Sequence, residues 1–432
     1  MSAPPPEDFS AYLDSLGNLG IEPSLAGIEA VCRALGDPQE KYDVIQVTGT
    51  NGKTSTSRMI QALLSAHGIK CGLYLSPHLE SYRERVSVNG VEIDEGGFEE
   101  LGRSVREKIT AVEESLGGRR VTQFEVITAA AFAYFERRGV RVAVVEVGMG
   151  GRWDATSVAV PKVAVITNVT MDHADWLGPA LTDIAGEKSY VIRAGNTVVV
   201  GPAAPEIRAI FERRAVGEKA KLIVVGEDAR VEADEHHAVA IETPKAVYGG
   251  IRLGVAGHWQ ERNAVTALAA AEAYVGQALN IETTRRALAQ VRSPGRAELI
   301  EGAPEILLDG AHNQSGVDAL SAHLRLEYAD RNPVLVVSIL RDKAAPVMVE
   351  TLDKAGREII FTDSGNPRCL DPYELSDMAA GEAVTVTVEP DPALALEMAK
   401  DLAGEKGLVV VTGSLYLVGV VRKLLRNQGV AF

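Results

Sequence analysis

The chain has 432 residues, 46% hydrophobic and 24% charged, an ordinary globular composition with room for two domains or three. Its formal net charge of −15 argues against nucleic acid or an anionic membrane as a partner, so an anionic substrate requires a local basic site. The three cysteines, Cys32, Cys71 and Cys369, lie far apart, which excludes a disulfide framework and a zinc site. This cysteine usage suits the reducing cytoplasm, where we expect the protein. We expect no signal peptide, because the first residues have neither a basic start nor an apolar core, and no transmembrane segment, because the apolar runs are only as long as strands.

The first strong pattern is a strand, a glycine-containing turn and a helix. A strand is predicted from Asp43 to Gln46 and a helix from Ser57 to His67. Between them, Val47-Thr48-Gly49-Thr50-Asn51-Gly52-Lys53-Thr54-Ser55 is typical of a phosphate-binding loop, although its first residue stands where the usual motif has Gly. We expect the backbone N–H groups and the helix N-terminus to bind phosphate, Lys53 to neutralise the β and γ phosphates, and the Thr54 hydroxyl to lie near Mg²⁺.

Strands and helices then alternate up to residue 291, as expected for a parallel sheet buried on both faces. Strands are predicted over 70–75, 140–147, 162–167, 197–200 and 221–225, a hairpin around Asn89-Gly90, and helices over 9–16, 24–35, 97–114, 125–138, 260–277 and 281–291. Polar side chains follow four of the strands. Because ligands bind at the carboxyl ends of strands in such sheets, we expect these side chains to converge on one crevice.

Candidate metal ligands and a candidate reactive lysine belong to this crevice. Glu146 closes a buried strand, and Ser76 and His173 follow two others, so their side chains are candidate ligands of Mg²⁺, directly or through water. Plainer interpretations are a helix cap for Glu146 and for Ser76, and a structural imidazole for His173. Lys188 either faces solvent or reacts with CO₂ to give a carbamate, an anionic oxygen ligand.

A linker at Ser293-Pro294-Gly295-Arg296 separates two predicted domains, an ATP-binding domain over 1–293 and a C-terminal domain over 297–432. The fold class is therefore α/β, a P-loop mononucleotide-binding domain followed by a smaller Rossmann-like α/β domain. No G-x-G-x-x-G motif occurs, which argues against a dinucleotide cofactor. In the second domain, strands are predicted over 306–308, 333–339, 358–362, 383–388 and 408–412, and helices from 315 and over 345–355, 372–380, 392–403 and 415–425.

Three further candidates lie in or near this second domain. The stretch Asp309 to Asn313 follows its first strand and offers a carboxylate, an imidazole and an amide beside a helix start. Arg296 lies in the linker, where closure of the domains could carry it to a γ-phosphate, as an arginine finger works. Asn263, early in a helix, is a candidate to hydrogen-bond adenine, with a helix-surface amide as the alternative.

Taken in order, these motifs resemble the Mur ligase superfamily, and most closely its folylpolyglutamate synthase/dihydrofolate synthase branch. Two positions depart from that pattern: Thr54 replaces a usual Gly, and the His-Gln-x-x-Asn element reads Trp259 to Asn263, with His258 displaced by one. The resemblance spans Phe9 to Tyr416 and rests on Thr48 to Thr54, Ser76-Pro77-His78-Leu79, Glu84-Arg85, Thr122-Gln123-Phe124-Glu125, Glu146 to Thr156, Asp172-His173, Glu187-Lys188, Pro294-Gly295-Arg296, Asp309 to Asn313 and Gly413-Ser414-Leu415-Tyr416.

The resemblance implies an ATP-dependent ligase that joins L-glutamate to the carboxylate of dihydropteroate or of a folate. The carboxylate attacks the γ-phosphate to give an acyl phosphate, which the glutamate amine then attacks. We expect a monomer that uses two Mg²⁺ ions, and the resemblance also allows a monovalent cation. The implied residues are Gly49, Thr50, Asn51, Gly52, Lys53, Thr54, Ser55, Asn263, Arg296 and Asp309 for ATP; Thr54, Ser76, Glu146 and His173 for metal; Lys53, Lys188, Arg296 and His312 for catalysis; and Thr122, Phe124, Arg152 and Asp154 for pterin or folate.

Two other functions compete with this hypothesis. Another Mur-type amino-acid ligase, acting on a cell-wall precursor or a related carboxylate, uses the same chemistry but usually carries an N-terminal domain that binds a UDP-sugar. The stretch before Asp43 is too short for such a domain. A nucleotide-gated binding protein or a simple kinase has no use for a complete second α/β domain. Which acceptor is used, the polyglutamate length and the linkage stay open.

Overall fold

A computed structural model of the chain describes residues 8–17, 23–234, 238–379 and 385–432. The chain falls into two compact units. The first contains Met1–Val169, Leu177–Leu253 and Glu261–Val291, and the second contains Thr170–Trp176, Gly254–Gln260 and Arg292–Phe432. Two short segments that precede the linker in sequence therefore belong to the second unit.

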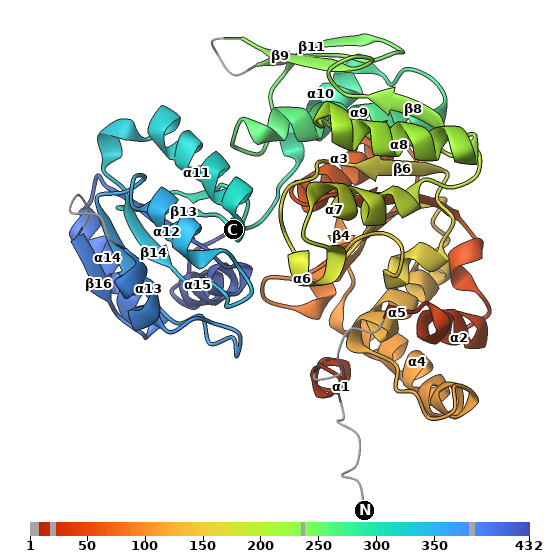
Figure 1. Cartoon of the computed structure of the whole chain (residues 1–432), viewed down its shortest axis with the longest axis horizontal. Helices are drawn as coiled ribbons and strands as arrows, with labels where there is room; N and C mark the ends of the chain where they lie inside the picture. Colours follow the sequence, from red (N-terminus) through yellow and green to blue (C-terminus); the bar gives the residue numbers. More distant parts are fainter. Residues whose placement is uncertain (1–7, 18–22, 235–237, 380–384) are drawn as a thin grey trace, which may run out of the picture. The chain divides into compact units, whose positions relative to one another are not determined.

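An eight-stranded sheet forms the centre of the first unit (Figure 1). Its strand order is β4-β3-β2-β5-β1-β6-β7-β8. Its parallel strands are β1 (Asp43–Thr48), β2 (Cys71–Tyr74), β5 (Val142–Glu146), β6 (Val163–Ile166), β7 (Thr197–Val200) and β8 (Lys221–Val224). The antiparallel edge strands β3 (Val86–Val88) and β4 (Val91–Glu92) form the predicted hairpin. Because β2, β5, β1 and β6 are parallel neighbours, their carboxyl ends lie along one edge of the sheet.

Helices cover both faces of this sheet. Val44, Ala143 and Val145 share a core with side chains of α2 (Ala26–Ala34), α4 (Glu95–Ser115) and α5 (Gln123–Arg137). Strand side chains point alternately to opposite faces, and α3 (Lys53–Ala66) packs against β1, β2 and β5. The other helices of this unit are α1 (Phe9–Ser15), α7 (Leu181–Lys188), α8 (Pro205–Glu218), α10 (Ile281–Gln290) and most of α9 (Trp259–Val275).

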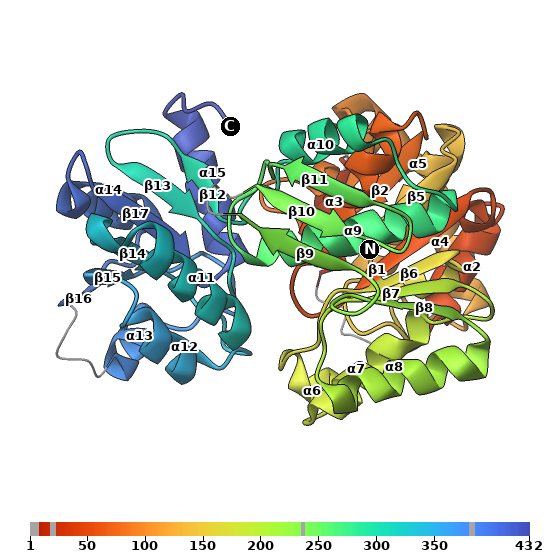
Figure 2. The ribbon, with the colours of Figure 1, turned by 90° about the horizontal axis from the view of Figure 1, so that it is seen from above.

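A small antiparallel sheet lies in the region 219–257, which the sequence predicts to be rich in β-structure. It consists of β9 (Arg230–Ala233), β10 (Val239–Glu242) and β11 (Val247–Ile251), and Figure 2 shows it beside α9 and α10. The buried Tyr248 hydroxyl of β11 donates a hydrogen bond to the Glu272 carboxylate of α9. This bond fixes the small sheet to the helix that carries Asn263.

The second unit is also an α/β structure, with a six-stranded sheet in the order β12-β13-β17-β14-β15-β16. Among the described strands of this sheet, only the edge strand β12 (Glu298–Ile300) is antiparallel to its neighbour. The remaining strands are β13 (Glu305–Leu308), β14 (Val334–Val337), β15 (Glu358–Phe361), β16 (Thr385–Val388) and β17 (Leu408–Thr412). The helices are α11 (Gln314–Glu327), α12 (Ala345–Leu352), α13 (Pro372–Met378), α14 (Pro392–Ala403) and α15 (Leu415–Asn427).

The predicted α/β fold class is confirmed, with local differences. Helix α3 begins at Lys53 rather than Ser57, because Gly52 adopts a left-handed φ of 80° that turns the loop directly into the helix. Helix α6 (Ala174–Leu177), helix α8 and strand β12 were not predicted. The predicted boundaries at residues 380 and 383 lie outside the described residues. Among the described helices, none combines the length and apolar character needed to cross a membrane.

Gly72 of β2 provides a test of this packing. A Cβ atom at Gly72 would lie 2.7 Å from Cδ1 of the fully buried Phe135 on α5. Gly72→Ala should therefore lower the free energy of unfolding by about 1–3 kcal/mol, measured by urea denaturation. Gly217→Ala in α8 is the matched control, because a Cβ there meets no neighbour and alanine favours a helix by up to about 1 kcal/mol. Equal stability of the two variants would contradict the packing described here.

Candidate functional site

The loop between β1 and α3 is held by the end of the neighbouring strand β6. The backbone N–H of Thr50 donates to the Asn168 carbonyl at 3.0 Å, and the N–H of Asn51 donates to Asn168 Oδ1 at 2.9 Å. The Thr167 hydroxyl donates to the Asn51 carbonyl at 2.6 Å. Sequence reasoning missed Thr167, although its place at a strand end in the same edge of the sheet was a usable signal. These three bonds fix the backbone of the loop.

Two glycines allow the close approach of other groups to this loop. A Cβ at Gly52 would lie 2.4 Å from Asn263 Oδ1, and a Cβ at Gly49 would lie 1.9 Å from Thr167 Oγ1. Both residues also adopt positive φ angles, 80° and 148°. Asn263, predicted as a nucleotide contact, is therefore placed directly against the loop.

The N-terminus of α3 and two lysines give the loop its positive potential. Helix α3 begins at Lys53 without a side-chain cap from Gly52, which leaves the end of the helix dipole for an anion. Lys53 Nζ donates to the carbonyls of Gly49 at 3.1 Å and Thr50 at 2.9 Å. Lys188 Nζ donates to the same Gly49 carbonyl at 2.9 Å, and its residue is only 4% exposed. Lys188 thus does not face solvent, and both ammonium groups lie at one carbonyl of the loop.

The candidate metal ligands of the first unit lie together around Glu146. This residue is 1% exposed, and the Thr54 hydroxyl donates to its Oε1 at 3.0 Å. The Ser76 backbone N–H reaches its Oε2 at 3.4 Å. The Ser76 hydroxyl is buried and has no hydrogen-bond partner among the described residues. Neither Glu146 nor Ser76 caps a helix, which removes the plainer interpretation of both.

The four candidate pterin residues have distinct surroundings. Thr122 is the N-cap of α5 and forms a capping box with Glu125, which gives it a structural role of its own. Asp154 is buried, which raises its pKa, and it accepts hydrogen bonds from backbone N–H groups. Phe124 and Asp154 meet at Gly148, where an added Cβ would lie 2.8 Å from the ring and 3.1 Å from Oδ2. Arg152 lies over the rings of Trp153 and Tyr190.

In the second unit, Asp309 holds the linker beside its own strand end. Its buried carboxylate accepts the N–H of Ala297 at 2.7 Å and the N–H of Ala311 at 2.9 Å. Burial raises the pKa of Asp309, and the charge of Arg296 opposes that rise. Arg296 and Asp309, both predicted nucleotide contacts, are therefore neighbours.

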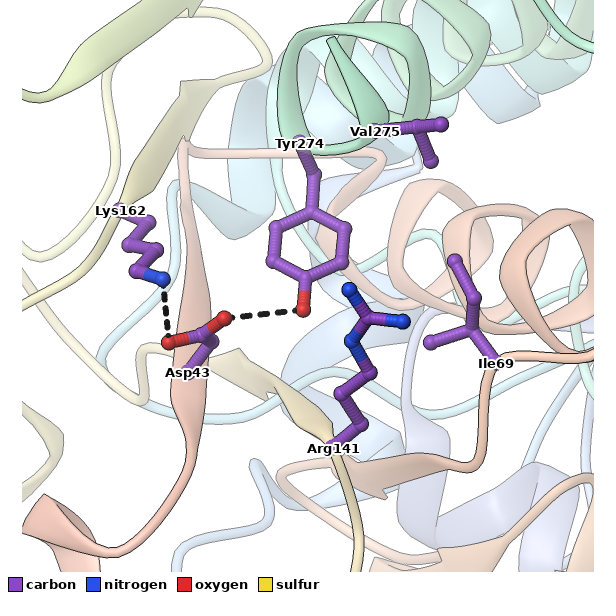
Figure 3. A pocket seen from close by; sticks show the side chains of 6 residues that line it. All are labelled: Asp43, Ile69, Arg141, Lys162, Tyr274 and Val275. Atoms are coloured by element: carbon purple, nitrogen blue, oxygen red, sulfur yellow. Dashed lines mark hydrogen bonds and ion pairs between the residues drawn. The ribbon is translucent and has the colours of Figure 1, made fainter.

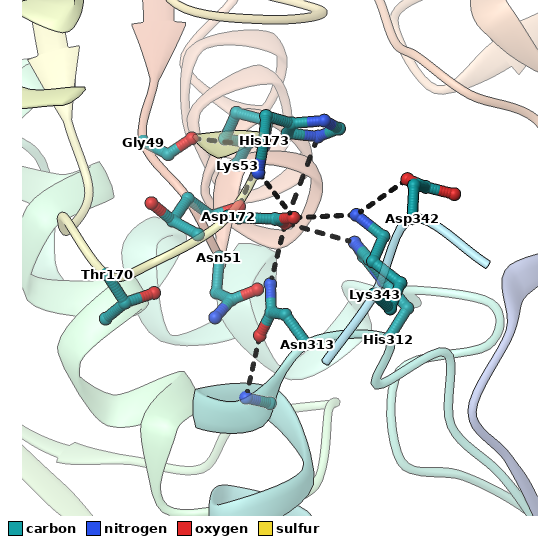
Figure 4. A network of polar contacts seen from close by, with 12 residues as sticks. Gly49, Asn51, Lys53, Thr170, Asp172, His173, His312, Asn313, Asp342 and Lys343 are labelled. Carbon is teal, nitrogen blue, oxygen red and sulfur yellow. Dashed lines mark hydrogen bonds and ion pairs between the residues drawn. The ribbon is translucent and has the colours of Figure 1, made fainter. Parts of the chain in front are cut away.

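A polar network centred on Asp172 lies in the same unit (Figure 4). Its carboxylate accepts Lys343 Nζ at 2.6 Å and Asn313 Nδ2 at 2.9 Å, and His312 Nε2 lies 3.8 Å away. Burial alone would raise the pKa of Asp172, but His173, Lys343 and His312 together hold it well below its usual range. Sequence reasoning missed Lys343, although it lies in the loop between β14 and α12, which follows a strand end. His173 itself has a left-handed φ of 54° and a side chain that is 38% exposed.

His312 is held in one tautomer. Its Nδ1 lies 2.7 Å from the Gly310 carbonyl, an arrangement that requires the proton on Nδ1 and leaves Nε2 as an acceptor. Burial lowers the pKa of His312 to about 4, and the charge of Lys343 acts in the same direction. The imidazole is therefore neutral near pH 7.

A shallow pocket at the opposite edge of the first unit's sheet is not part of this site (Figure 3). It lies where β1, β5 and β6 begin, whereas the phosphate-loop residues follow the end of β1. Asp43 forms an ion pair with Lys162 at 2.7 Å and accepts a hydrogen bond from the Tyr274 hydroxyl at 3.0 Å. These contacts tie α9 to the amino ends of the strands.

The pKa of His312 gives a pH prediction. Because the pKa falls from 6.5 to about 4 on folding, the unfolded chain binds a proton in this window and the folded chain does not. The free energy of unfolding should therefore decrease as the pH falls from 6.5 towards 4. The His312 resonances, assigned by comparison with His312→Asn, should not titrate between pH 5.5 and 8. A midpoint near 6.5 would contradict the buried neutral imidazole.

Comparison with known proteins identifies the family. The Mur ligase middle domain matches residues 47–271, and the Mur ligase glutamate ligase domain matches residues 295–415. The dihydrofolate synthase/folylpolyglutamate synthase of Mycobacterium tuberculosis is 35% identical over 94% of this chain and 90% of its own length. A solved M. tuberculosis folylpolyglutamate synthase, complexed with ADP, is similar with a TM-score of 0.90 and 35% identity over 95% of this chain and 96% of its own. An Escherichia coli relative solved with DHPP and ADP has a TM-score of 0.88 and 28% identity over 98% and 97%. The chain therefore belongs to the folylpolyglutamate synthase/dihydrofolate synthase family of Mur ligases.

Proposed function

We propose that the chain joins L-glutamate to the carboxylate of dihydropteroate, of reduced folates, or of both, with ATP as co-substrate and ADP and phosphate as products. One observation carries the proposal: Lys53 lies at the uncapped N-terminus of α3 and donates to the Gly49 carbonyl, so an ammonium group and the positive end of a helix dipole meet at this loop. A chain with a net charge of −15 needs such a local basic site to bind a triphosphate. Solved relatives that hold ADP, and DHPP with ADP, support the same chemistry.

The oxygen atoms around Glu146 fit a magnesium ion. Mg²⁺ prefers oxygen ligands and usually takes one or two carboxylates together with substrate phosphates. Glu146, the Thr54 hydroxyl and the buried Ser76 hydroxyl without a described partner supply such a set. When bound there, the ion would neutralise charge on the phosphate oxygens. From the family resemblance we propose that His173, which belongs to the second unit, binds a second ion.

The proposed reaction has two steps, and the chain's own residues position and neutralise rather than form covalent bonds. The acceptor carboxylate attacks the γ-phosphate and ADP leaves. The glutamate amine then attacks the acyl carbon and expels phosphate. Lys53 and the N-terminus of α3 would neutralise the phosphates, with Gly49 to Ser55 as the cradle. A carbamate on Lys188 would add an anionic oxygen ligand at the same place.

We assign the remaining family positions in the same way. Asn263 would contact the adenine, and Asp309 and Arg296 the rest of the nucleotide. His312, neutral with Nε2 as an acceptor, would act near the reacting groups of the second step. Phe124, Asp154, Thr122 and Arg152 would bind the pterin. We also propose that residues 1–293 form the ATP-binding domain and 297–432 the C-terminal domain, joined by the linker 293–296.

The folate ligase is favoured over another Mur-type ligase. Relatives that match nearly the whole chain are named for folate ligation. The assay is release of ADP with glutamate and either dihydropteroate or tetrahydrofolate as the acceptor. ADP release should depend on both glutamate and an acceptor. Turnover of ATP that ignores the acceptor would instead favour a kinase or a nucleotide-gated binding protein.

Lys53→Ala tests the phosphate loop. Loss of the ammonium group leaves the β and γ phosphates less neutralised, so kcat should fall by at least about 10²–10³-fold. Lys162→Ala is the control, because it removes a lysine at the opposite edge of the sheet and should leave kcat unchanged. Retained activity of Lys53→Ala would remove this loop from the mechanism.

Lys188→Ala tests the carbamate. The variant should lose activity, and formate or acetate should restore part of it by supplying the missing carboxylate-like oxygens. Lys53→Ala should not respond to these acids. A ¹³C carbamate signal should form from labelled bicarbonate in the unaltered protein and be absent in Lys188→Ala. The absence of that signal in the unaltered protein would refute the carbamate.

A further inference from the structure

Arg85 is a buried arginine whose charge is not balanced by a carboxylate. It ends the 3-10 turn η2 (Tyr82–Arg85) and is 7% exposed. Its Nε donates to His78 Nδ1 at 2.9 Å, and its guanidinium carbon lies 5.2 Å from the centre of the Tyr82 ring. Among the described residues, no carboxylate forms an ion pair with it. A buried charge without a counter-charge costs free energy unless a ligand supplies one.

Two carboxylates near this arginine are already engaged: Glu84 is its neighbour in sequence, and Asp154, like Arg85, influences the pKa of Tyr74. Glu84 accepts the backbone N–H groups of Leu79 at 2.9 Å, Glu80 at 2.7 Å and Ser81 at 2.7 Å. Asp154 accepts the N–H groups of Met149 at 2.9 Å and Thr156 at 3.0 Å. Both carboxylates therefore hold loop backbone, and neither forms an ion pair with Arg85 among the described residues.

His78 adds a second donor without adding a charge. Because its Nδ1 accepts the hydrogen bond from Arg85, its proton resides on Nε2. The guanidinium and this N–H together suit a carboxylate, which accepts hydrogen bonds at both oxygens.

The pair lies near two parts of the proposed site. Arg85 lies close enough to the buried Tyr74 hydroxyl for its charge to oppose the rise that burial causes in the Tyr74 pKa. The Tyr74 ring in turn lies 6.2 Å from the ring of Phe124, a candidate pterin contact. Along the chain, Ser76 is two residues from His78, and its backbone N–H reaches the Glu146 carboxylate. An acceptor that extends from Phe124 towards the phosphate loop would therefore pass this pair.

We propose that Arg85 and His78 bind the non-reacting carboxylate of a folate acceptor. This inference rests on the proposed function. A folate ends in a glutamyl group with two carboxylates, one of which reacts while the other needs a counter-charge. Dihydropteroate has a single carboxylate, which is the one that reacts. Arg85 therefore determines how well a folate, but not dihydropteroate, is used.

Steady-state kinetics with both acceptors test the proposal. Arg85→Gln should lower kcat/KM for tetrahydrofolate by about 10–100-fold, mainly through KM, because it removes a charge-assisted hydrogen bond. The value for dihydropteroate should change less than about threefold, a difference within the range of a weak contact. Arg85→Lys should restore part of the loss. Arg83→Gln is the matched control, since Arg83 lies on the same turn and donates to the Ile93 carbonyl.

The outcomes separate this proposal from the proposed function. Loss with tetrahydrofolate alone supports it. Equal loss with both acceptors overturns it and gives Arg85 a structural role, which a lower melting temperature of Arg85→Gln would also reveal. Turnover of dihydropteroate but not tetrahydrofolate by the unaltered protein overturns it as well and leaves the ligase function intact. Turnover of neither acceptor overturns both.

Discussion

The hydrogen bonds from the end of β6 to the loop after β1 are the constraint on which the proposed site depends. Asn168 and Thr167 bind the backbone of Thr50 and Asn51, and they do so only because β1 and β6 are parallel neighbours in register. Positive φ angles at Gly49 and Gly52 then bring Asn263 and Thr167 close to the loop. With this backbone fixed, α3 begins at Lys53, and the N–H groups of its first turn face the place where the loop would bind phosphate.

The positive charge of Lys53 and the positive end of the α3 dipole are concentrated at that point, although the chain as a whole is acidic. Lys53 and Lys188 come from different helices, yet both donate to the Gly49 carbonyl. The Glu146 carboxylate accepts hydrogen bonds from the Thr54 hydroxyl and the Ser76 backbone N–H. A nucleotide with its metal ion carries both negative and positive charge. The ammonium group suits the phosphates, and the carboxylate and hydroxyl oxygens suit the metal ion.

Much of this arrangement could be predicted from sequence because the polar residues follow apolar strands. The ends of β1, β2, β5 and β6 were predicted to converge, and parallel pairing of these strands produces that convergence. The α/β fold class followed from the alternation of strands and helices. What local patterns could not supply were long-range pairings. Lys343 and Asp172 are 171 positions apart, and only the folded second unit joins them. The burial of Arg85 was likewise not predicted, since it depends on how the segment folds back so that Arg85 meets His78 and the Tyr82 ring.

The central claim is that an acyl phosphate forms from the acceptor carboxylate at this loop. The most direct measurement uses an acceptor with ¹⁸O in its reactive carboxylate and follows the label into inorganic phosphate by mass spectrometry. Attack of the carboxylate on the γ-phosphate, followed by expulsion of phosphate by the amine, transfers one labelled oxygen per turnover. The account predicts labelled phosphate in step with ADP and amide. Amide formation with no ¹⁸O in the phosphate would contradict it.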